Sequence, residues 1–213
     1  MAYKNVFFDL DGTLTDSGAG IMNCAKLALE HFGLPIPSPE QMRTIVGPPL
    51  NDSFIRFGVP ADRVDEAIRV YRSRYTTVGK FENNPYPGIR ELLERLKNDG
   101  CKLYVATSKP EGMSVEILEK FELAAYFEVI AGATLDGSRS AKSDVIAYLQ
   151  KTIGGAENVV MIGDTAFDVI GAEAHGIPTI GVSWGYGEIA DMEKAGAAAI
   201  AHTPQELYKL ITQ

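Results

Sequence analysis

Short apolar runs alternate with amphipathic stretches through most of this chain. Apolar runs closed by glycine or polar residues are typical of buried strands, and apolar residues at helical spacing are typical of helices that cover a sheet. We expect strands at residues 6–8, 102–107, 127–131, 159–163, 178–182 and 198–201. We expect helices at residues 89–99, 114–121, 143–152, 166–174, 189–194 and 204–211. This alternation predicts an α/β fold with a doubly wound parallel sheet.

The pattern is different between residues 15 and 84, where no convincing strand is found. Amphipathic helices are expected at 21–32, 40–46, 50–57 and 61–78. A boundary signal, Asn84-Pro85-Tyr86-Pro87-Gly88, then closes this segment. We therefore expect a core domain of residues 1–15 and 85–213, with an all-helical domain of residues 16–84 inserted after the first strand. Such an insertion hangs over the carboxyl edge of the sheet, as a mobile cap or, alternatively, as a passive decoration.

Composition narrows the classes of partner. The chain has 213 residues, of which 46% are hydrophobic, enough for one sizeable core with a smaller appendage. Its formal net charge is -8 and no block of Lys or Arg occurs, so we expect neither nucleic acid polymers nor membranes as partners. Cys24 and Cys101 lie in apolar stretches without metal-ligand spacing. We therefore expect both cysteines to be buried free thiols and the protein to be cytoplasmic. We expect the protein to be a monomer or a homodimer.

Two acidic residues, Asp9 and Asp11, directly follow the first apolar run. Residues two apart in a strand point the same way, so both carboxylates can face one site. In open α/β sheets, ligands bind in the crevice at the carboxyl ends of the strands. Taken alone, such a pair often only caps a helix or solvates a loop.

Three further segments strengthen the prediction of a site at this edge. Thr107-Ser108-Lys109 ends the second strand, Lys142 precedes a helix, and Asp164 and Asp168 follow the fourth strand. Alone, Lys142 is typical of a surface lysine and Asp164 of a helix cap. Together they suit phosphoryl transfer: carboxylates hold Mg²⁺, a lysine and a hydroxyl neutralise and orient phosphoryl oxygens, and one carboxylate attacks phosphorus.

With these motifs the chain resembles the haloacid dehalogenase-like phosphatases over essentially its whole length. That family has a Rossmann-like core with a helical cap inserted after its first motif, which here is Asp9-Leu10-Asp11-Gly12-Thr13. The chain is most similar to the branch of phosphoglycolate phosphatases and their 5'-nucleotidase relatives. The stretch Gly181-Val182-Ser183-Trp184-Gly185-Tyr186-Gly187 is also similar to that branch.

The resemblance implies a role for each carboxylate. Asp9 would be the nucleophile and a metal ligand. Asp11 would bind the metal through its backbone carbonyl and act first as general acid, then as general base. Asp164 would be the other carboxylate ligand, and Asp168 would hold metal-bound water or orient Lys142.

The resemblance also implies the phosphate-binding groups. Thr107 and the Ser108 amide would bind the transferring phosphate with Leu10, and Lys142 would balance its charge. The family's lysine is often followed by proline, whereas Ser143 follows here. Lys109 is the competing lysine, and we interpret Lys109-Pro110 as the lead-in to a helix.

Substrate specificity is expected to come from the inserted domain. We expect Arg43, Gly47 and Pro48 to contact the substrate, because the rigid Gly47-Pro48-Pro49 turn can project toward the core; the alternative is that this turn is a simple helix break. Tyr71 and Tyr75 are interpreted as the core of this domain. Trp184 either lies at the edge of the site or is simply a packing residue.

The function predicted from these motifs is a Mg²⁺-dependent phosphomonoesterase acting through an aspartyl phosphate. Its substrate would be a small phosphorylated metabolite: phosphoglycolate, a nucleoside monophosphate or a sugar phosphate. One alternative is a sugar phosphomutase of the β-phosphoglucomutase type, which keeps both aspartates of the first motif. Another is a non-catalytic phospho-receiver or regulatory module, although such modules are usually far shorter and lack the second acid pair.

Overall fold

The computed structural model of the chain describes residues 3–213, which divide into two compact units. One unit comprises the chain up to Thr15 together with Pro85–Gln213, and the other comprises Asp16–Asn84. The chain passes between the units at Thr15–Asp16 and Asn84–Pro85, the short strands β2 and β3 of a two-stranded sheet. The first unit is called the core unit below, and the second the inserted unit.

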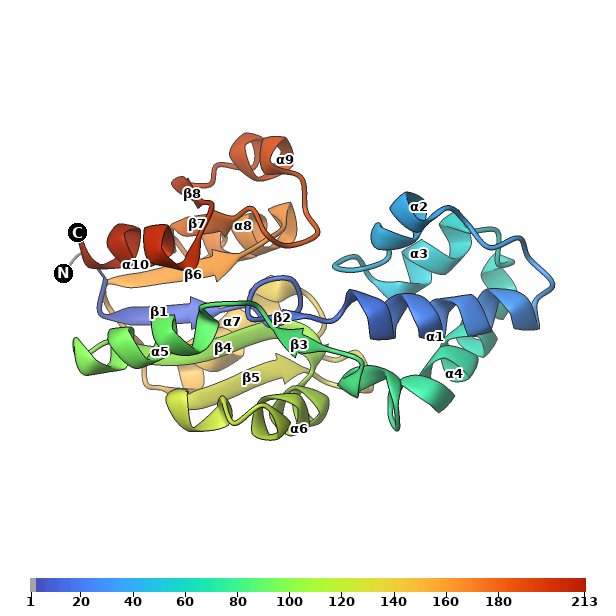
Figure 1. Cartoon of the computed structure of the whole chain (residues 1–213), viewed down its shortest axis with the longest axis horizontal. Coiled ribbons are helices and arrows are strands. Elements are labelled where there is room, and N and C mark those ends of the chain that lie inside the picture. The colour runs from blue at the N-terminus through green and yellow to red at the C-terminus, as the bar shows by residue number, and fades with distance from the viewer. Residues whose placement is uncertain (1–2) are drawn as a thin grey trace. The chain divides into compact units, whose positions relative to one another are not determined.

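The core unit is built on a six-stranded parallel sheet in the order β5-β4-β1-β6-β7-β8 (Figure 1). Its strands are β1 (Asn5–Phe8), β4 (Lys102–Pro110), β5 (Val129–Ala133), β6 (Val159–Gly163), β7 (Thr179–Val182) and β8 (Ala199–Ala201). β1 lies in the middle, between β4 and β6, so the chain leaves β1 toward one side and returns on the other. This order confirms the predicted doubly wound sheet and creates a switch point beside β1, where such folds bind ligands.

Helices cover both faces of this sheet. They are α5 (Ile89–Asn98), α6 (Glu111–Lys120), η3 (Ala124–Tyr126), α7 (Lys142–Thr152), α8 (Ala166–Glu173), α9 (Ile189–Lys194) and α10 (Pro204–Thr212). Figure 1 shows α5 and α7 on opposite sides of the strands. The connections are the right length for crossovers between parallel strands, which usually contain a helix.

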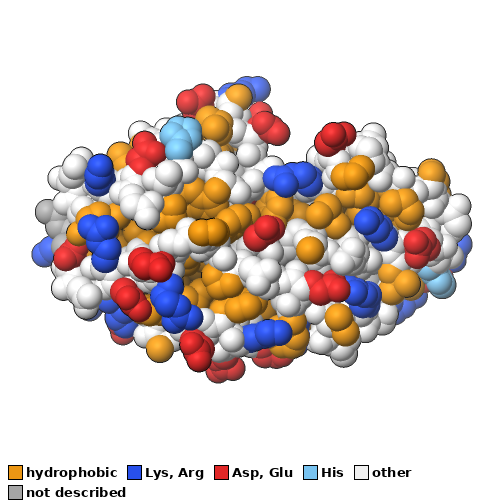
Figure 2. Space-filling model, viewed as in Figure 1, with side chains coloured by type: hydrophobic (Ala, Val, Ile, Leu, Met, Phe, Trp, Pro, Cys, Tyr) orange, Lys and Arg blue, Asp and Glu red, His pale blue; other side chains and the backbone are white. Residues whose placement is uncertain are grey.

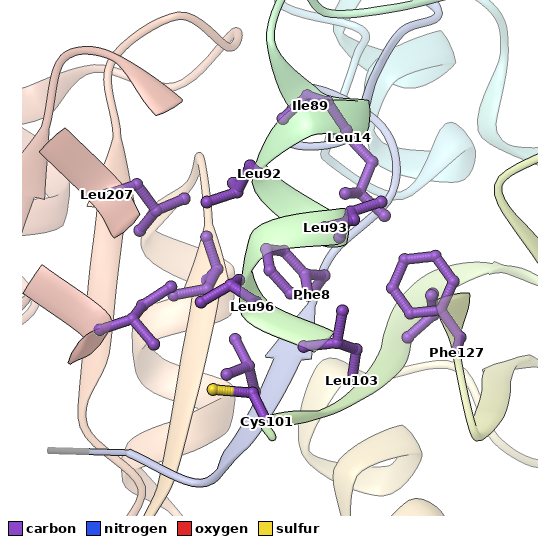
Figure 3. Packing of buried hydrophobic residues seen from close by; sticks show 14 of the residues in the cluster. Phe8, Leu14, Ile89, Leu92, Leu93, Leu96, Cys101, Leu103, Phe127 and Leu207 are labelled. Carbon is purple, nitrogen blue, oxygen red and sulfur yellow. The ribbon is translucent and has the colours of Figure 1, made fainter. Parts of the chain in front are cut away.

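Alternation along β1 explains the two layers. Phe8 belongs to the hydrophobic cluster on the α5 side, where it lies near Leu93 and Leu103 (Figure 3). Phe7, the next residue, belongs to the cluster on the other side, which includes Val145 of α7. Both phenylalanines are fully buried, and complete burial of such a side chain contributes about 1.5–3 kcal/mol. The central strand is thus apolar on both faces, as expected for a parallel sheet.

The inserted unit is helical. Its elements are α1 (Gly18–His31), α2 (Pro39–Arg43), α3 (Leu50–Arg56), η1 (Ala61–Arg63), α4 (Val64–Tyr75) and η2 (Gly79–Phe81). Tyr71 and Tyr75 are buried on α4 and stack with ring centroids 5.0 Å apart, which confirms their interpretation as the core of this unit. Arg74 of the same helix forms an ion pair with Glu82, with 2.6 Å between nitrogen and oxygen.

The prediction of one long helix over residues 61–78 is wrong. Residues Ala61–Arg63 form a 3-10 turn, and α4 ends at Tyr75. Pro60 lies immediately before this turn. After Tyr75 come Thr76-Thr77-Val78, and β-branched residues lose side-chain freedom in a helix. The helix therefore ends before this run.

The second strand of the core also differs from the prediction. β4 continues to Pro110, three residues past the expected end at Thr107, and its pairing with β5 shifts register between Ala106 and Pro110. α6 accordingly begins at Glu111 rather than at residue 114. The interpretation of Lys109-Pro110 as a helix lead-in is therefore wrong for Lys109, which belongs to the strand.

The two cysteines and the charged surface residues can be compared with the sequence predictions. Cys24 and Cys101 are buried free thiols, as predicted. Positive and negative side chains lie interspersed over the face of the core unit shown in Figure 2. Among the helices of residues 3–213, none combines the length and the apolar character needed to span a bilayer.

Candidate active site

Three buried carboxylates converge at the carboxyl edge of the core sheet. Asp9 directly follows β1, Asp164 directly follows β6, and Asp168 lies in the first turn of α8. Each places a carboxylate oxygen within 4.8 Å of the other two. Their exposed fractions are only 8%, 1% and 1%. Because β1 and β6 pair directly, residues that follow them meet although they are far apart in sequence.

Lys142 joins two of these carboxylates. Its ammonium nitrogen lies 2.7 Å from Asp9 Oδ1 and 2.8 Å from Asp168 Oδ1, and it donates to the carbonyl oxygen of Ala106 at 2.9 Å. Burial opposes the charged form of this lysine, but Asp168 and Asp9 outweigh burial and hold its pKa above the ordinary value. Lys142 is therefore a fixed positive charge between the two acids.

Burial and neighbouring charges raise the pKa values of two of these carboxylates. Burial, reinforced by the nearby charge of Asp168, raises the pKa of Asp9 to about 6, although Lys142 opposes the shift. Burial also raises the pKa of Asp164 well above its ordinary value, with Asp168 and Asp9 adding to the effect. Lys142 alone does not neutralise the cluster, so a further cation would stabilise its ionised form.

The two carboxylate oxygens of Asp168 have different partners. Its Oδ2 accepts hydrogen bonds from the backbone N–H of Thr165 at 3.1 Å and from the Thr165 hydroxyl at 2.9 Å, which caps α8. Its Oδ1 faces Lys142. The cap thus fixes the carboxylate that orients the lysine. Asp164 is not the N-cap of α8; Thr165 occupies that position.

Asp11 stands apart from the cluster and has a lysine of its own. Its Oδ2 lies 2.7 Å from the ammonium nitrogen of Lys109, and the side chains are 17% and 5% exposed. The backbone N–H of Lys109 donates to the Thr107 hydroxyl at 3.2 Å. Lys109 is therefore a site residue that the sequence interpretation missed. The signal was present, because Thr107 and Lys109 are two apart in a strand and share a direction.

The other residues predicted to bind the phosphate, Thr107, Ser108 and Leu10, differ in how far their side chains are buried. Thr107 is 2% exposed and follows Ala106, whose carbonyl oxygen binds Lys142, whereas Ser108 is exposed. The Leu10 side chain is fully buried in the hydrophobic cluster on the α5 side, so only its backbone could meet a substrate.

The predicted specificity residues belong to the inserted unit. Arg43 is the exposed last residue of α2, and Gly47, with a φ of 103°, opens the exposed turn before α3. Pro48 follows in that turn and is half-buried. Their part in substrate binding stays a prediction.

Asp164 also has partners that the sequence did not reveal. The Thr13 hydroxyl donates to Asp164 Oδ1 at 3.3 Å, and the backbone N–H of Tyr186 donates to Asp164 Oδ2 at 2.8 Å. The indole N–H of Trp184 donates to the Thr13 carbonyl oxygen at 3.0 Å. The two contacts of Thr13 join residues 151 and 171 positions apart, and Tyr186 is 22 positions from Asp164, so no local pattern signals them.

The donor set suits a hard divalent cation. Four carboxylates and two ammonium groups meet at this edge, which leaves an excess of two negative charges when all are ionised. Carboxylate oxygens without histidine or thiolate favour Mg²⁺, Ca²⁺ or Mn²⁺ over zinc. Asp9, Asp164 and Asp168 are the residues that could hold the ion through their side chains.

Comparison with known proteins identifies one family and several similar proteins. A family model described as haloacid dehalogenase-like hydrolase matches residues 6–182. Tyrosine-protein kinase PtkA of Mycobacterium tuberculosis is 43% identical over 92% of this chain and 68% of its own length. A 5'-nucleotidase of Pseudomonas aeruginosa is 41% identical over 88% of this chain and 86% of its own. Proteins named phosphoglycolate phosphatase are further relatives.

A solved structure supports the same assignment. The crystal structure of a predicted phosphatase from Clostridium acetobutylicum superimposes with a TM-score of 0.93 at 43% sequence identity, covering 98% of each chain. The likeness extends over the inserted unit as well as the core, since almost the whole of both chains is covered.

Proposed function

This chain belongs to the haloacid dehalogenase-like hydrolases, and from that premise we propose that it is a Mg²⁺-dependent phosphomonoesterase. Its substrate would be a small phosphorylated metabolite of the phosphoglycolate, nucleoside monophosphate or sugar phosphate class. One observation carries the proposal: Lys142 bridges Asp9 and Asp168 beside Asp164, all buried at the switch point of the sheet. Relatives named 5'-nucleotidase and phosphoglycolate phosphatase support the same class of substrate.

In the first half-reaction, Asp9 attacks phosphorus. Lys142 engages Oδ1 of Asp9, so we assign the attack to Oδ2. A bond forms between that oxygen and phosphorus while the bond from phosphorus to the ester oxygen breaks. Asp11, as general acid, gives a proton to the departing alkoxide. The products are an aspartyl phosphate and a free alcohol.

In the second half-reaction, water attacks the phosphorus of the aspartyl phosphate. Asp11, now ionised, takes a proton from this water, and the bond between phosphorus and Asp9 breaks. Inorganic phosphate leaves and Asp9 returns as a carboxylate. When bound, Mg²⁺ would be held by Asp9, Asp164 and the carbonyl of Asp11 and would neutralise phosphoryl charge.

Other groups would bind and position the phosphate. Lys142 is a charge of the required sign, fixed by two carboxylates and a carbonyl oxygen. The Thr107 hydroxyl and the Ser108 amide lie in the carboxyl-terminal half of the neighbouring strand β4 and would orient the phosphoryl oxygens. The inserted unit would act as a cap, with Arg43, Gly47 and Pro48 contacting the leaving group. The two buried free thiols suit a reducing compartment such as the cytoplasm.

The deciding experiment is phosphate release from a panel of phosphoglycolate, nucleoside monophosphates and sugar phosphates in the presence of Mg²⁺. We expect one class to be turned over well above the others and activity to vanish in excess EDTA. Asp9→Asn is the matched control, since it keeps the size of the side chain and removes the nucleophile. Turnover by this variant, or full activity in EDTA, would contradict the mechanism.

The same panel separates the alternatives. Conversion of glucose 1-phosphate to the 6-isomer without phosphate release would indicate a mutase, and a long-lived phosphoprotein without turnover would indicate a regulatory module.

A second candidate is phosphoryl transfer to a tyrosine hydroxyl. It is favoured by the 43% identity to the proteins named tyrosine-protein kinase PtkA, which covers 92% of this chain. The aspartyl phosphate would then pass to the hydroxyl oxygen of a tyrosine in place of water, with Asp11 taking the phenolic proton. Incubation with ATP and a tyrosine peptide would yield phosphotyrosine under this reading, and only free phosphate under the first.

A further inference from the structure

Asp164 lies between two loops that are distant in sequence. One loop follows β1 and contains Gly12 and Thr13; the other follows β7 and contains Trp184-Gly185-Tyr186-Gly187. These six residues are called the clamp below. Asp164 is 1% exposed between them.

Each loop supplies one hydrogen bond to the carboxylate. Thr13 donates its hydroxyl to Oδ1 at 3.3 Å, and Tyr186 donates its backbone N–H to Oδ2 at 2.8 Å. One donor on each oxygen fixes the plane of the carboxylate as well as its position. Neither donor comes from the cluster of acids, so both can hold Asp164 before any cation arrives.

Three glycines let the loop backbones close on Asp164. A Cβ built on Gly12 would lie 2.2 Å from Asp164 Oδ2, and one built on Gly185 would lie 2.3 Å from Asp164 Cβ. A Cβ on Gly187 would lie 2.1 Å from the Asp164 carbonyl oxygen. All are far inside contact distance, so no residue with a Cβ fits at these positions without moving Asp164.

Trp184 fastens the two loops to each other. Its indole N–H donates to the Thr13 carbonyl oxygen at 3.0 Å, and its ring contacts Tyr86 edge-on with centroids 6.5 Å apart. Trp184 therefore binds Thr13, whose hydroxyl donates to Asp164 Oδ1. It also lies two positions before Tyr186, whose backbone N–H donates to Asp164 Oδ2. The hydrogen bond and the ring contact of Trp184 are thus made with Thr13 and Tyr86, and not with the acids or Lys142.

We propose that Trp184 is a positioning residue that keeps the clamp closed and thereby holds Asp164 ready for a divalent cation. The reason is electrostatic: Asp164 lies within 4.8 Å of two other carboxylates, and in the ionised cluster their repulsion opposes its position, which the hydrogen bonds from the clamp maintain. A clamped carboxylate binds the ion without first being reordered. This inference rests on the metal dependence in the proposed function.

The first test is Trp184→Phe, which keeps an aromatic ring and removes the indole donor. Binding is measured with Mn²⁺ alone as the probe, by electron paramagnetic resonance of the free ion. Loss of groups that orient metal ligands typically weakens binding by about 10- to 100-fold, and we expect the lower end of this range. Tyr126→Phe is the matched control, because it removes a 2.8 Å bond to Glu94 elsewhere on the core unit.

A second comparison shows whether Trp184 acts through Thr13. Thr13→Val removes the hydroxyl that binds Asp164, whereas Thr13→Ser keeps it. We expect Thr13→Val to weaken Mn²⁺ binding and Thr13→Ser to restore most of it. Combining Thr13→Val with Trp184→Phe should cost less than the sum of the two single effects, because both loosen the same support. Where Trp184→Phe does not fold, Thr13→Val and Thr13→Ser still test the support of Asp164 through which Trp184 acts, and a Thr13→Val protein with wild-type Mn²⁺ affinity overturns the proposal.

The outcomes separate the two proposals. Mn²⁺ affinity of Trp184→Phe equal to that of the wild type, or fully additive effects with Thr13→Val, overturns the positioning role alone. A wild-type protein that binds no Mn²⁺ overturns the metal dependence, and the role of Trp184 with it. Weaker binding by Trp184→Phe and Thr13→Val, with Tyr126→Phe unchanged, supports both.

Discussion

Lys109 Nζ lies 2.7 Å from Asp11 Oδ2, in an ion pair that joins the end of β4 to the loop after β1. The pair is separate from the bridge that Lys142 makes between Asp9 and Asp168. The site therefore contains two lysines with different partners. One faces the proposed nucleophile, and the other faces the proposed acid and base.

Replacing Lys109 by methionine should slow turnover more than it weakens substrate binding. Methionine keeps the length of the side chain and leaves Asp11 without its ionic partner. General acid and base catalysis typically contributes about 10²- to 10⁴-fold, so a misplaced Asp11 should lower kcat by about tenfold or more with a smaller change in KM. Steady-state kinetics measure both, and Lys109→Arg should recover part of kcat. A change confined to KM would contradict this role.

Replacing Lys142 by methionine should be more damaging than the change at Lys109. It leaves Asp9 and Asp168 buried without their shared cation, and breaking a buried ion pair in this way costs about 3–5 kcal/mol. Urea unfolding in EDTA measures the loss, and turnover should be abolished. Lys151→Met on the exposed side of the same helix is the matched control. A Lys142→Met protein as stable as the wild type would argue against the bridge.

The stability of the metal-free protein should depend on pH through Asp9. Its pKa of about 6 in the folded protein, raised first by burial, lies above the ordinary value of 3.8. The folded state therefore holds this proton more tightly than the unfolded state does. The resulting stabilisation is fully present below about pH 4 and is lost as the pH rises through about 6, amounting to about 3 kcal/mol at most.

Asp9→Asn isolates this effect because it does not titrate. Urea unfolding of both proteins in EDTA, at several values between pH 4 and pH 8, should show the variant gaining relative to the wild type up to about pH 6 and no further. A stability difference that is constant over the whole range would refute the raised pKa.

Gly12→Ala should disturb the site as well as the backbone. Gly12 has a φ of 85°, and a Cβ there would meet Asp164 Oδ2 at 2.2 Å. Gly137 has a φ of 79°, with nothing within 4 Å of its Cβ position. Gly137→Ala should cost only the backbone strain, about 1 kcal/mol, and leave Mn²⁺ binding intact. Gly12→Ala should cost more in urea unfolding and should weaken Mn²⁺ binding, and equal behaviour of the two variants would contradict the close approach.

Much of the fold could be predicted because it depends on local periodicity. Phe7 and Phe8 face opposite sides of the sheet, as an apolar strand in a parallel sheet requires. The positions of Asp9 and Asp164 after their strands were also predictable, since strand ends are marked by the chain itself. The length of α4 was not, because apolar spacing continues past Tyr75 while the β-branched residues oppose a helix.

The sequence by itself determined which side chains are delivered to the carboxyl edge of the sheet, because each strand carries its next loop to that edge. Only the tertiary structure decided how they pair. Lys142 meets Asp9 and Asp168, and Lys109 meets Asp11, because β1 lies between β4 and β6 and because β4 shifts register before Pro110. The contact of Trp184 with Thr13 depends on two loops 171 residues apart. Such contacts depend on strand order and side-chain geometry, which no local pattern encodes.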